Sequence, residues 1–134
     1  MRVLLPGELR RRLFEEARTA HPAECCGLLE GKWDGDLVDV LALHPARNLA
    51  LGIDRFDIHP KDHIAAQKAA RGRGHAIIGC YHSHPHSRAE PSAADLAGAG
   101  EEEFLWLIAG GESLNAFVYR RGRFTGADWV TSSP

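Results

Sequence analysis

The sequence has few cysteines and no long apolar run, and both absences limit what the protein is. Only three cysteines occur, Cys25, Cys26 and Cys80, and no CxxC pair is present. An odd number with two adjacent members does not suit a disulfide framework, which favours a reducing cytoplasm. No apolar stretch approaches the roughly 20 residues of a membrane-spanning helix. The N-terminus, MRVLLPGELRRR, lacks the apolar core and cleavage site of a signal peptide, so a cytoplasmic protein without membrane contact is expected.

The chain also lacks an excess of positive charge, internal repeats and a linker. Its formal net charge is -2, which argues against a protein that binds nucleic acid through bulk electrostatics. Local basic clusters such as Arg10-Arg11-Arg12 are typical of a solvated surface. A length of 134 residues is enough to bury a real core, and we expect one domain over residues 1–134.

Local patterns predict helices and strands that alternate early in the chain and strands that cluster late. Helices are expected at 6–20, 59–71 and about 92–99, and strands at 25–31, 37–44, 76–81, 104–109, 114–119 and 124–130, with a short strand at 56–58. The turn of the first hairpin is expected at 32–36. In the second helix, Ile64, Ala65, Lys68 and Ala69 lie on one side. A mixed sheet with helices packed on it is the simplest arrangement, an α/β fold.

Three of the eight histidines lie between His82 and His86, in the segment GCYHSHPHSRAEPSAADLAG. Tyr81 is expected to end an apolar strand, so His82 and His84 stand where this strand leaves the core. Residues two apart in an extended segment point the same way, so both imidazoles can face one point while Ser83 faces away. The proline that follows removes an amide donor and stiffens the exit from the strand.

Ser92 and Asp95 follow at a spacing that places them on one face of a helix. If this helix folds back over the strand end, Asp95 completes a set of two histidines and one carboxylate. Three such ligands leave a fourth position open, as in catalytic zinc sites, although cobalt, manganese or iron also suit them. The alternative is a capping box in which serine and aspartate only start a helix. Both interpretations stay open at this point.

The strand, HSHP, six further residues, Ser92, two residues and Asp95 resemble the metalloprotease signature of the JAMM family, also called JAB or MPN-plus. Family members carry a glutamate on an early strand, and Glu24 in HPAECCGLLEG stands in a similar setting. Asn48 and the segment 55–60 match more loosely, and the resemblance extends from the first helix to about Tyr119. It implies an α/β fold with a mixed, curved β-sheet flanked by helices, in the deaminase-like JAB/MPN arrangement.

Carried over position by position, the resemblance implies a site with one zinc ion per chain. His82, His84 and Asp95 would be the metal ligands. Glu24 would take a proton from the attacking water and deliver it to the leaving amine, as general base and then general acid. Ser92 would donate a hydrogen bond to the developing oxyanion. A capping role of Ser92 would compete for the same hydroxyl oxygen.

The resemblance also indicates a class of substrate. The insertions that shape recognition in eukaryotic deubiquitinating members look short or absent, so the chain is similar to the compact prokaryotic members. Those enzymes cleave after the C-terminal Gly-Gly of a ubiquitin-like or sulfur-carrier protein, which would be the partner here. Trp129 and Val130 are apolar residues near the end of the chain, and they leave two roles open, intramolecular packing or a homodimer contact.

Three other functions agree less well with the residues of this sequence. A non-catalytic MPN-type metal-binding or interaction module would have no need to keep every motif position. A nucleobase deaminase would need H-x-E and P-C-x-x-C, and neither occurs. A thiol hydrolase built on Cys80 would need an exposed cysteine rather than one in an apolar strand. Glu30, Glu90 and the run 101–103 compete with Glu24, and His86 is left as an unassigned residue at the rim.

Overall fold

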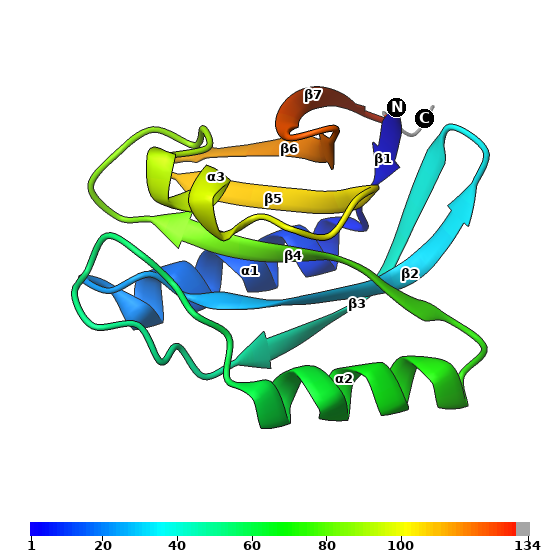
Figure 1. Cartoon of the computed structure of the whole chain (residues 1–134), viewed down its shortest axis with the longest axis horizontal. Coiled ribbons are helices and arrows are strands. Elements are labelled where there is room, and N and C mark those ends of the chain that lie inside the picture. The colour runs from blue at the N-terminus through cyan, green and yellow to red at the C-terminus, as the bar shows by residue number, and fades with distance from the viewer. Residues whose placement is uncertain (131–134) are drawn as a thin grey trace.

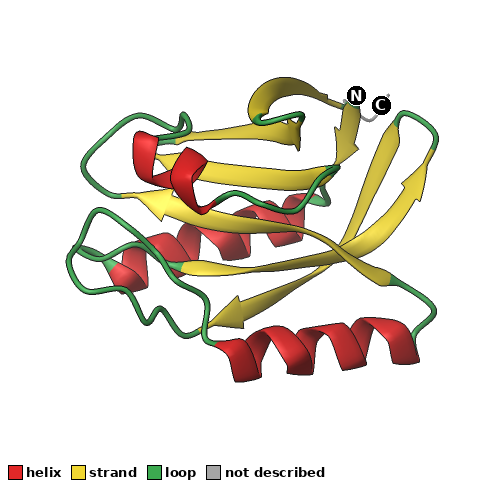
Figure 2. Ribbon diagram, in the orientation of Figure 1, coloured by secondary structure: helices red, strands yellow, loops and turns green. Residues whose placement is uncertain are grey.

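The computed structural model of the chain describes residues 1–130, which form three helices and seven strands (Figure 1 and Figure 2). In chain order these are β1 (Arg2–Leu4), α1 (Gly7–Ala20), β2 (Cys26–Asp34), β3 (Leu37–Ala46), α2 (Pro60–Gly72), β4 (Ala76–His84), α3 (Ala93–Gly98), β5 (Phe104–Gly110), β6 (Ser113–Arg120) and β7 (Arg123–Trp129). Within this described range, no helix has the length and apolar character needed to cross a membrane.

The strands form a mixed, curved sheet in the order β7-β6-β5-β4-β2-β3-β1. Strand β4 lies at the centre, parallel to β5 and antiparallel to β2. The short β1 pairs in parallel with β3 and, over two residues, with β7, so the curvature brings the two ends of the sheet together. Figure 1 shows α1 behind the sheet and α3 in front of β4 and β5. The predicted fold class, a mixed curved sheet flanked by helices, is confirmed.

Successive residues of β4 face two different cores. Tyr81 belongs to the larger core, which includes residues of α1, whereas Cys80 packs in a smaller core with Ala66 of α2. Side chains alternate between the two faces of a strand. His82 therefore follows Cys80 on the α2 side of the sheet, and Ser83 follows Tyr81 on the α1 side. This alternation sets the two sides of the candidate site.

The side of the second helix that carries Ile64 and Ala65 is not its buried face. Helix α2 buries Ala66 and Ala70, while Ile64 is 53% exposed and Ala65, Lys68 and Ala69 do not belong to the buried set. The first turn decides this orientation, because the Asp62 carboxylate accepts hydrogen bonds from the backbone and the guanidinium of Arg47. Positions 62, 66 and 70 lie four apart and share a helix face, so fixing the first turns the other two inward.

Most strands are longer than predicted, and the extensions of two of them change the picture of the hairpin and of the site. Strand β2 continues to Asp34, so the hairpin turn is confined to Gly35 and Asp36 and does not begin at residue 32. Strand β4 continues beyond Tyr81 to His84, because the ladder with β5 runs to the pair His84–Gly110. His82 and His84 thus belong to the last part of a central strand instead of following it. The expected strand at 56–58 is reduced to a single bridge between Asn48 and Ile58.

Strand β1 was not predicted, because three residues are too short for a recognisable alternation. It is held by its neighbours, and the Val130 N–H donates to the carbonyl oxygen of Val3 at 2.9 Å. Trp129 packs against the larger core, and the Arg10 guanidinium carbon lies 5.6 Å from the centre of its ring. Trp129 therefore has an intramolecular role, and a homodimer stays a prediction.

A buried carboxylate anchors the C-terminal end of α2 to the sheet. Glu30 of β2 is fully buried and accepts two hydrogen bonds from the Arg73 guanidinium, at 2.8 and 2.6 Å. The imidazoles of His44 and His75 lie 2.8 and 2.6 Å from its two oxygens. The hydrogen bonds from Arg73 hold the pKa of Glu30 well below its usual range, although burial acts in the opposite direction. Every oxygen of this carboxylate is used, which removes Glu30 from the candidates for catalysis.

Replacing Glu30 with glutamine should lower the free energy of unfolding by about 2 kcal/mol at pH 7, because a buried charge network loses its only anion. Glu30 has a lower pKa in the folded than in the unfolded chain, so its stabilisation is present above about pH 4.5 and is lost as the pH falls below that value. Urea unfolding of wild type and E30Q at pH 7 and pH 3.5 should therefore show a difference that shrinks in acid. The exposed Glu112, changed to glutamine, is the control; an equal loss in E112Q would contradict a specific role.

Candidate metal centre and active site

The C-terminal end of β4 brings two imidazole nitrogens together. His82 and His84 are both buried, and their Nε2 atoms lie 3.0 Å apart. Their rings meet edge to face, at a centroid distance of 4.8 Å. Both side chains leave the same face of the strand, as the spacing of two residues predicts.

The start of α3 brings a carboxylate to the same point. Asp95 Oδ2 lies 3.1 Å from the Nε2 atoms of both His82 and His84. The same oxygen accepts a hydrogen bond from the backbone N–H of Ser92 at 2.9 Å, and Ser92 Oγ accepts one from the N–H of Asp95 at 3.0 Å. A capping box is therefore present, and it holds Asp95 against the histidines. The two interpretations of this motif are not exclusive.

The three converging atoms have the spacing of a metal site. Tetrahedral zinc with nitrogen and oxygen ligands at about 2.0–2.2 Å separates these atoms by roughly 3.3 Å. The triangle of two nitrogens and one oxygen has edges of 3.0, 3.1 and 3.1 Å. Lone pairs that face one another at this distance repel unless a cation or a proton lies between them. The donor set of two imidazoles and one carboxylate thus fits a divalent zinc ion.

Burial and hydrogen bonds act differently on the two histidines. The His84 Nδ1 atom lies 2.7 Å from the Arg88 carbonyl oxygen, and a hydrogen bond donated to this acceptor leaves Nε2 to face the site. Burial acts to lower the pKa of His84, but hydrogen bonds with Asp95 and the Arg88 carbonyl raise it above its usual value. Burial lowers the pKa of His82, which favours the neutral imidazole. Burial acts to raise the pKa of Asp95, but its hydrogen bonds with His82 and His84 outweigh this, and the pKa lies well below its usual range. The carboxylate therefore stays ionised while His82 is neutral.

Aromatic side chains wall the site on the α2 side. The Phe56 ring stacks on the His82 ring at a centroid distance of 4.3 Å and an angle of 24°. Trp106 of β5 meets His82 edge to face at 5.7 Å. His82 Nδ1 has no hydrogen-bond partner among residues 1–130, so on that side of the ring the orientation is set by stacking and not by a hydrogen bond. Sequence reasoning missed Phe56 and Trp106, because apolar residues of this kind are ordinarily core.

Glu24 faces the histidines from the loop that precedes β2. It is buried, and Glu24, His82 and His84 each offer one potential ligand atom within 4.8 Å of the others. Its Oε1 atom has no hydrogen-bond partner in the described part of the chain. Burial raises the pKa of Glu24 to about 7. A carboxylate with a free oxygen and a pKa near neutrality can accept and release a proton at physiological pH.

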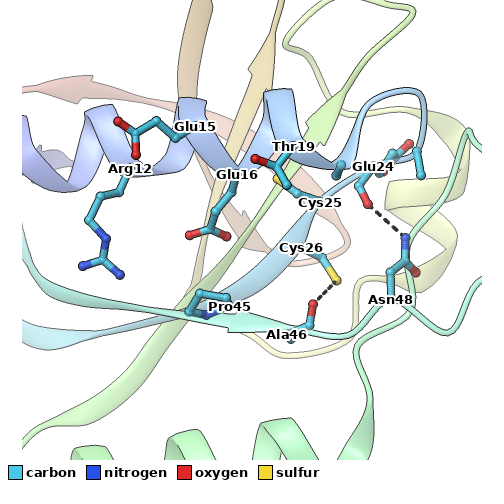
Figure 3. A pocket seen from close by; sticks show the side chains of 12 residues that line it. Arg12, Glu15, Glu16, Thr19, Glu24, Cys25, Cys26, Pro45, Ala46 and Asn48 are labelled. Carbon is cyan, nitrogen blue, oxygen red and sulfur yellow. Dashed lines mark hydrogen bonds between the residues drawn. The ribbon is translucent and has the colours of Figure 1, made fainter.

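A groove reaches Glu24 from the side of α1. Figure 3 shows this groove, which has a volume of about 690 Å³ and lies between α1 and the ends of β2 and β3. Glu16 and Glu15 of α1 lie on one side of it, and Pro45 and Ala46 of β3 on the other. Glu24 therefore lines this groove, whereas His82, His84 and Asp95 are not among its lining residues.

The remaining candidates lie apart from this point or are occupied. Glu90 and Glu101 to Glu103 are exposed, and Glu103 pairs with Arg120 at 2.7 Å. His86 is exposed at the rim, where its Nε2 lies 3.2 Å from the carbonyl oxygen of Pro22 and its ring meets His21. It does not join the other two histidines.

The cysteines are inert, as expected from their apolar surroundings. All three are reduced and buried. Burial raises the pKa of Cys25 to about 11 and that of Cys26 to about 12, and it raises the pKa of Cys80 well above its usual value. A thiol of this kind does not form the thiolate that nucleophilic catalysis requires. The structure therefore gives no support to a thiol hydrolase.

Comparison with known proteins gives consistent matches. Residues 6–123 match the model of a family described as prokaryotic homologs of the JAB domain. The chain is 31% identical over 134 residues to a desampylase of Haloferax volcanii, covering 96% of this chain and 88% of the relative. It is 34% identical over 98 residues to the deubiquitinase MYSM1 of Homo sapiens, a match that covers 72% of this chain but only 12% of that relative. The solution structure of a protein from Desulfitobacterium hafniense superposes with a TM-score of 0.88 at 28% identity, covering 100% of this chain and 94% of that one.

Proposed function

Since the chain belongs to the JAB family, in its prokaryotic branch, we propose that it is a zinc-dependent isopeptidase or peptidase acting on ubiquitin-like proteins. The observation that carries the proposal is the convergence of His82, His84 and Asp95 within 3.1 Å, with Glu24 facing them. Two relatives are named as a desampylase and a deubiquitinase, enzymes that remove protein modifiers. Their names support hydrolysis of the bond between such a modifier and its target.

The residues of the site divide the work as follows. His82, His84 and Asp95 would hold the metal, which when bound would supply a Lewis acid for the amide carbonyl and lower the pKa of a water molecule towards about 7. Glu24 accepts the proton of the attacking water at its carboxylate and passes it to the nitrogen of the leaving amine. Its pKa of about 7 suits both transfers, because the group is poised between its two forms. The apolar wall of Phe56 and Trp106 limits the access of further water.

Ser92 supplies the remaining polar group. Its hydroxyl oxygen accepts a hydrogen bond from the N–H of Asp95. A hydroxyl has one donor and two acceptor sites, so the O–H is still free to donate a second hydrogen bond. We propose that the Ser92 O–H donates a hydrogen bond to the oxyanion as the carbonyl is attacked. The capping role and the catalytic role therefore use different parts of the same side chain, and they do not compete.

Replacing Ser92 with alanine should separate the two roles. Loss of the cap is expected to cost about 1 kcal/mol of stability. Loss of an oxyanion donor should lower kcat by about 10²-fold with KM little changed. Threonine at this position keeps both functions of the hydroxyl and is the matched control. A lower melting temperature with full turnover in S92A would leave Ser92 as a helix cap only.

The groove beside Glu24 supports a particular substrate, a ubiquitin-like or sulfur-carrier protein with a Gly-Gly tail. We propose that a tail without side chains lies extended in this groove, with its last carbonyl close to Glu24. In the described strand pairs, β1 covers β3 only from Leu37 to Asp39, so the edge of β3 next to the groove has no strand neighbour. An extended tail can add to such an edge through main-chain hydrogen bonds.

A paired assay on the purified protein tests the proposal. Metal content by elemental analysis is measured beside cleavage of a ubiquitin-like carrier that carries one residue after Gly-Gly, with and without a chelator. We expect about one zinc per chain and cleavage that the chelator abolishes. Zinc without cleavage of this carrier or of a lysine-linked conjugate would point to a metal-binding module instead. Absence of both would refute the proposed function.

A further inference from the structure

The peptide group between Glu24 and Cys25 lies outside the sheet ladder. Regular pairing of β2 begins at Cys26, which pairs with His82 on one side and with Ala46 on the other. Glu24 and Cys25 are nevertheless buried. Buried backbone groups need hydrogen-bond partners, and here the sheet does not supply them. The backbone that carries the candidate base must be held in another way.

Two side chains hold this peptide group from opposite sides. The Asn48 side-chain amide donates to the Glu24 carbonyl oxygen at 3.2 Å, as Figure 3 shows. The Cys25 N–H donates to Ser83 Oγ at 2.9 Å, and the Ser83 N–H donates back to the Cys25 carbonyl oxygen at 3.2 Å. The Glu24 carbonyl and the Cys25 N–H belong to the same planar peptide group. The hydrogen bonds to Asn48 and Ser83 together therefore fix the orientation of that plane. The plane in turn sets the direction of the Glu24 side chain.

Asn48 makes four hydrogen bonds. Its Nδ2 donates to the carbonyl oxygens of Glu24 and Arg55, both at 3.2 Å. Its Oδ1 accepts from the N–H groups of Ala50 and Asp57 at 3.0 and 2.8 Å. Two carbonyls on one side and two amides on the other permit a single orientation of the amide. Asn48 thus joins Glu24 to the loop whose Phe56 stacks on His82.

Ser83 stands between the two histidines and points to the opposite face of β4. It is 3% exposed, and its hydroxyl is taken up by Cys25 on the α1 side. A single strand therefore presents the two imidazoles on one face and holds the loop of Glu24 from the other. This hydrogen bond gives a structural reason for the serine that stands between the two histidines in the sequence.

We propose that Ser83 and Asn48 are positioning residues that place the Glu24 carboxylate relative to His82 and His84; the inference rests on the proposed function. The Glu24 side chain has several rotatable bonds, and its Oε1 has no partner among residues 1–130. The orientation of the backbone is consequently its main constraint. A displacement of about 1 Å in a reacting group can lower turnover by about 10²-fold.

Four single variants and one double variant, S83A/N48D, test the proposal. S83A removes the acceptor for Cys25, and S83T retains it. N48D loses the donors to Glu24 and Arg55 but keeps an oxygen for Ala50 and Asp57. S113A removes an exposed hydroxyl on β6 and is the control.

We expect S83A and N48D to lower kcat by at least about tenfold, with KM and zinc content unchanged. S83T should restore turnover. The double variant should lose little more than the worse single one, because both residues hold one peptide group.

A measurement on the metal-free protein is independent of activity. Amide hydrogen exchange at Cys25, followed by NMR, should be about fivefold faster in S83A and unchanged in S113A and S83T, since one hydrogen bond is lost. If the wild type cleaves no substrate, the proposed function fails while this measurement still tests the hydrogen bond. Full kcat in S83A and N48D, failure of S83T to restore turnover, or unchanged exchange at Cys25 in S83A would overturn the inference. If S83A does not fold, N48D still tests the proposal, because it removes the hydrogen bond on the other side of the same peptide group, at a residue that is only half-buried.

Discussion

Replacing Glu24 with glutamine should leave zinc bound and lower turnover by at least about 10²-fold. Glutamine has nearly the shape of glutamate, so the groove and the histidine pair should stay intact. Its amide cannot accept the proton of the attacking water or deliver a proton to the leaving amine. The loss should therefore fall on kcat, with KM little changed, because the step affected is proton transfer in the transition state. Steady-state kinetics and metal analysis of the same preparation check this result.

The control for this variant is Glu90, an exposed carboxylate on the loop that follows the histidines. E90Q removes the same charge from the neighbourhood of the site, but its side chain is not buried against His82 or His84. Full activity in E90Q with loss in E24Q would separate proton transfer from a general electrostatic effect. Retained turnover in E24Q would mean that another group is the base. Loss of zinc in E24Q would make Glu24 a ligand instead, which the 4.8 Å grouping with both histidines also permits.

The parts of the site that the sequence predicts are those fixed by local periodicity. His82 and His84 share a face because side chains alternate along a strand. Ser92 and Asp95 meet because three residues make almost one helical turn. Each pair needs only a short stretch of regular backbone, and in each case the expected side chains do come together. The expected alternation of Ser83 to the opposite face follows from the same periodicity.

The placement of Glu24 could not be predicted from such patterns. Its partners lie 58 to 60 positions later in the chain, and only tertiary folding brings them close. Resemblance to a family pointed to this residue, whereas the hydrogen bonds of the Glu24–Cys25 peptide group with Asn48 and Ser83 became visible only in the structure. Phe56 was missed for a related reason. It lies in an irregular loop, where no periodicity indicates which way a side chain points.

The errors in the fold have the same origin. The pattern of apolar residues ends strand β4 at Tyr81, but hydrogen bonds to β5 and β2 extend the strand through residues that are polar and buried. An apolar pattern cannot indicate that polar residues continue a central strand, and in this chain those polar residues are the ones at the candidate metal site. The buried face of helix α2 also depends on tertiary contacts, because the hydrogen bonds between Asp62 and Arg47 join residues 15 positions apart. Local preference was overridden by tertiary contacts in both cases.

Replacing His82 with alanine should remove zinc and activity together. His82 supplies one of three proposed ligands, and even the loss of an outer-shell partner lowers metal affinity by roughly 10- to 100-fold. We therefore expect zinc affinity to fall by more than about 10²-fold. The measurement is a competition titration with a chelating indicator, beside the turnover assay. H86A is the matched control, because His86 lies four positions later, is exposed, and should leave zinc affinity unchanged.

A second variant keeps the result interpretable. His82 is 0% exposed and packs between Phe56 and Trp106, so alanine also leaves a cavity that lowers stability by about 2–4 kcal/mol. Phenylalanine at this position keeps most of the volume and both aromatic contacts but has no ligand nitrogen. H82F should therefore fold better than H82A and still fail to bind zinc. If H82F binds zinc as tightly as the wild type, His82 is a core residue, and the metal must be sought among Glu24, His84 and Asp95. If H82F loses zinc while its melting temperature stays close to that of the metal-free wild type, the loss belongs to the nitrogen and not to the packing.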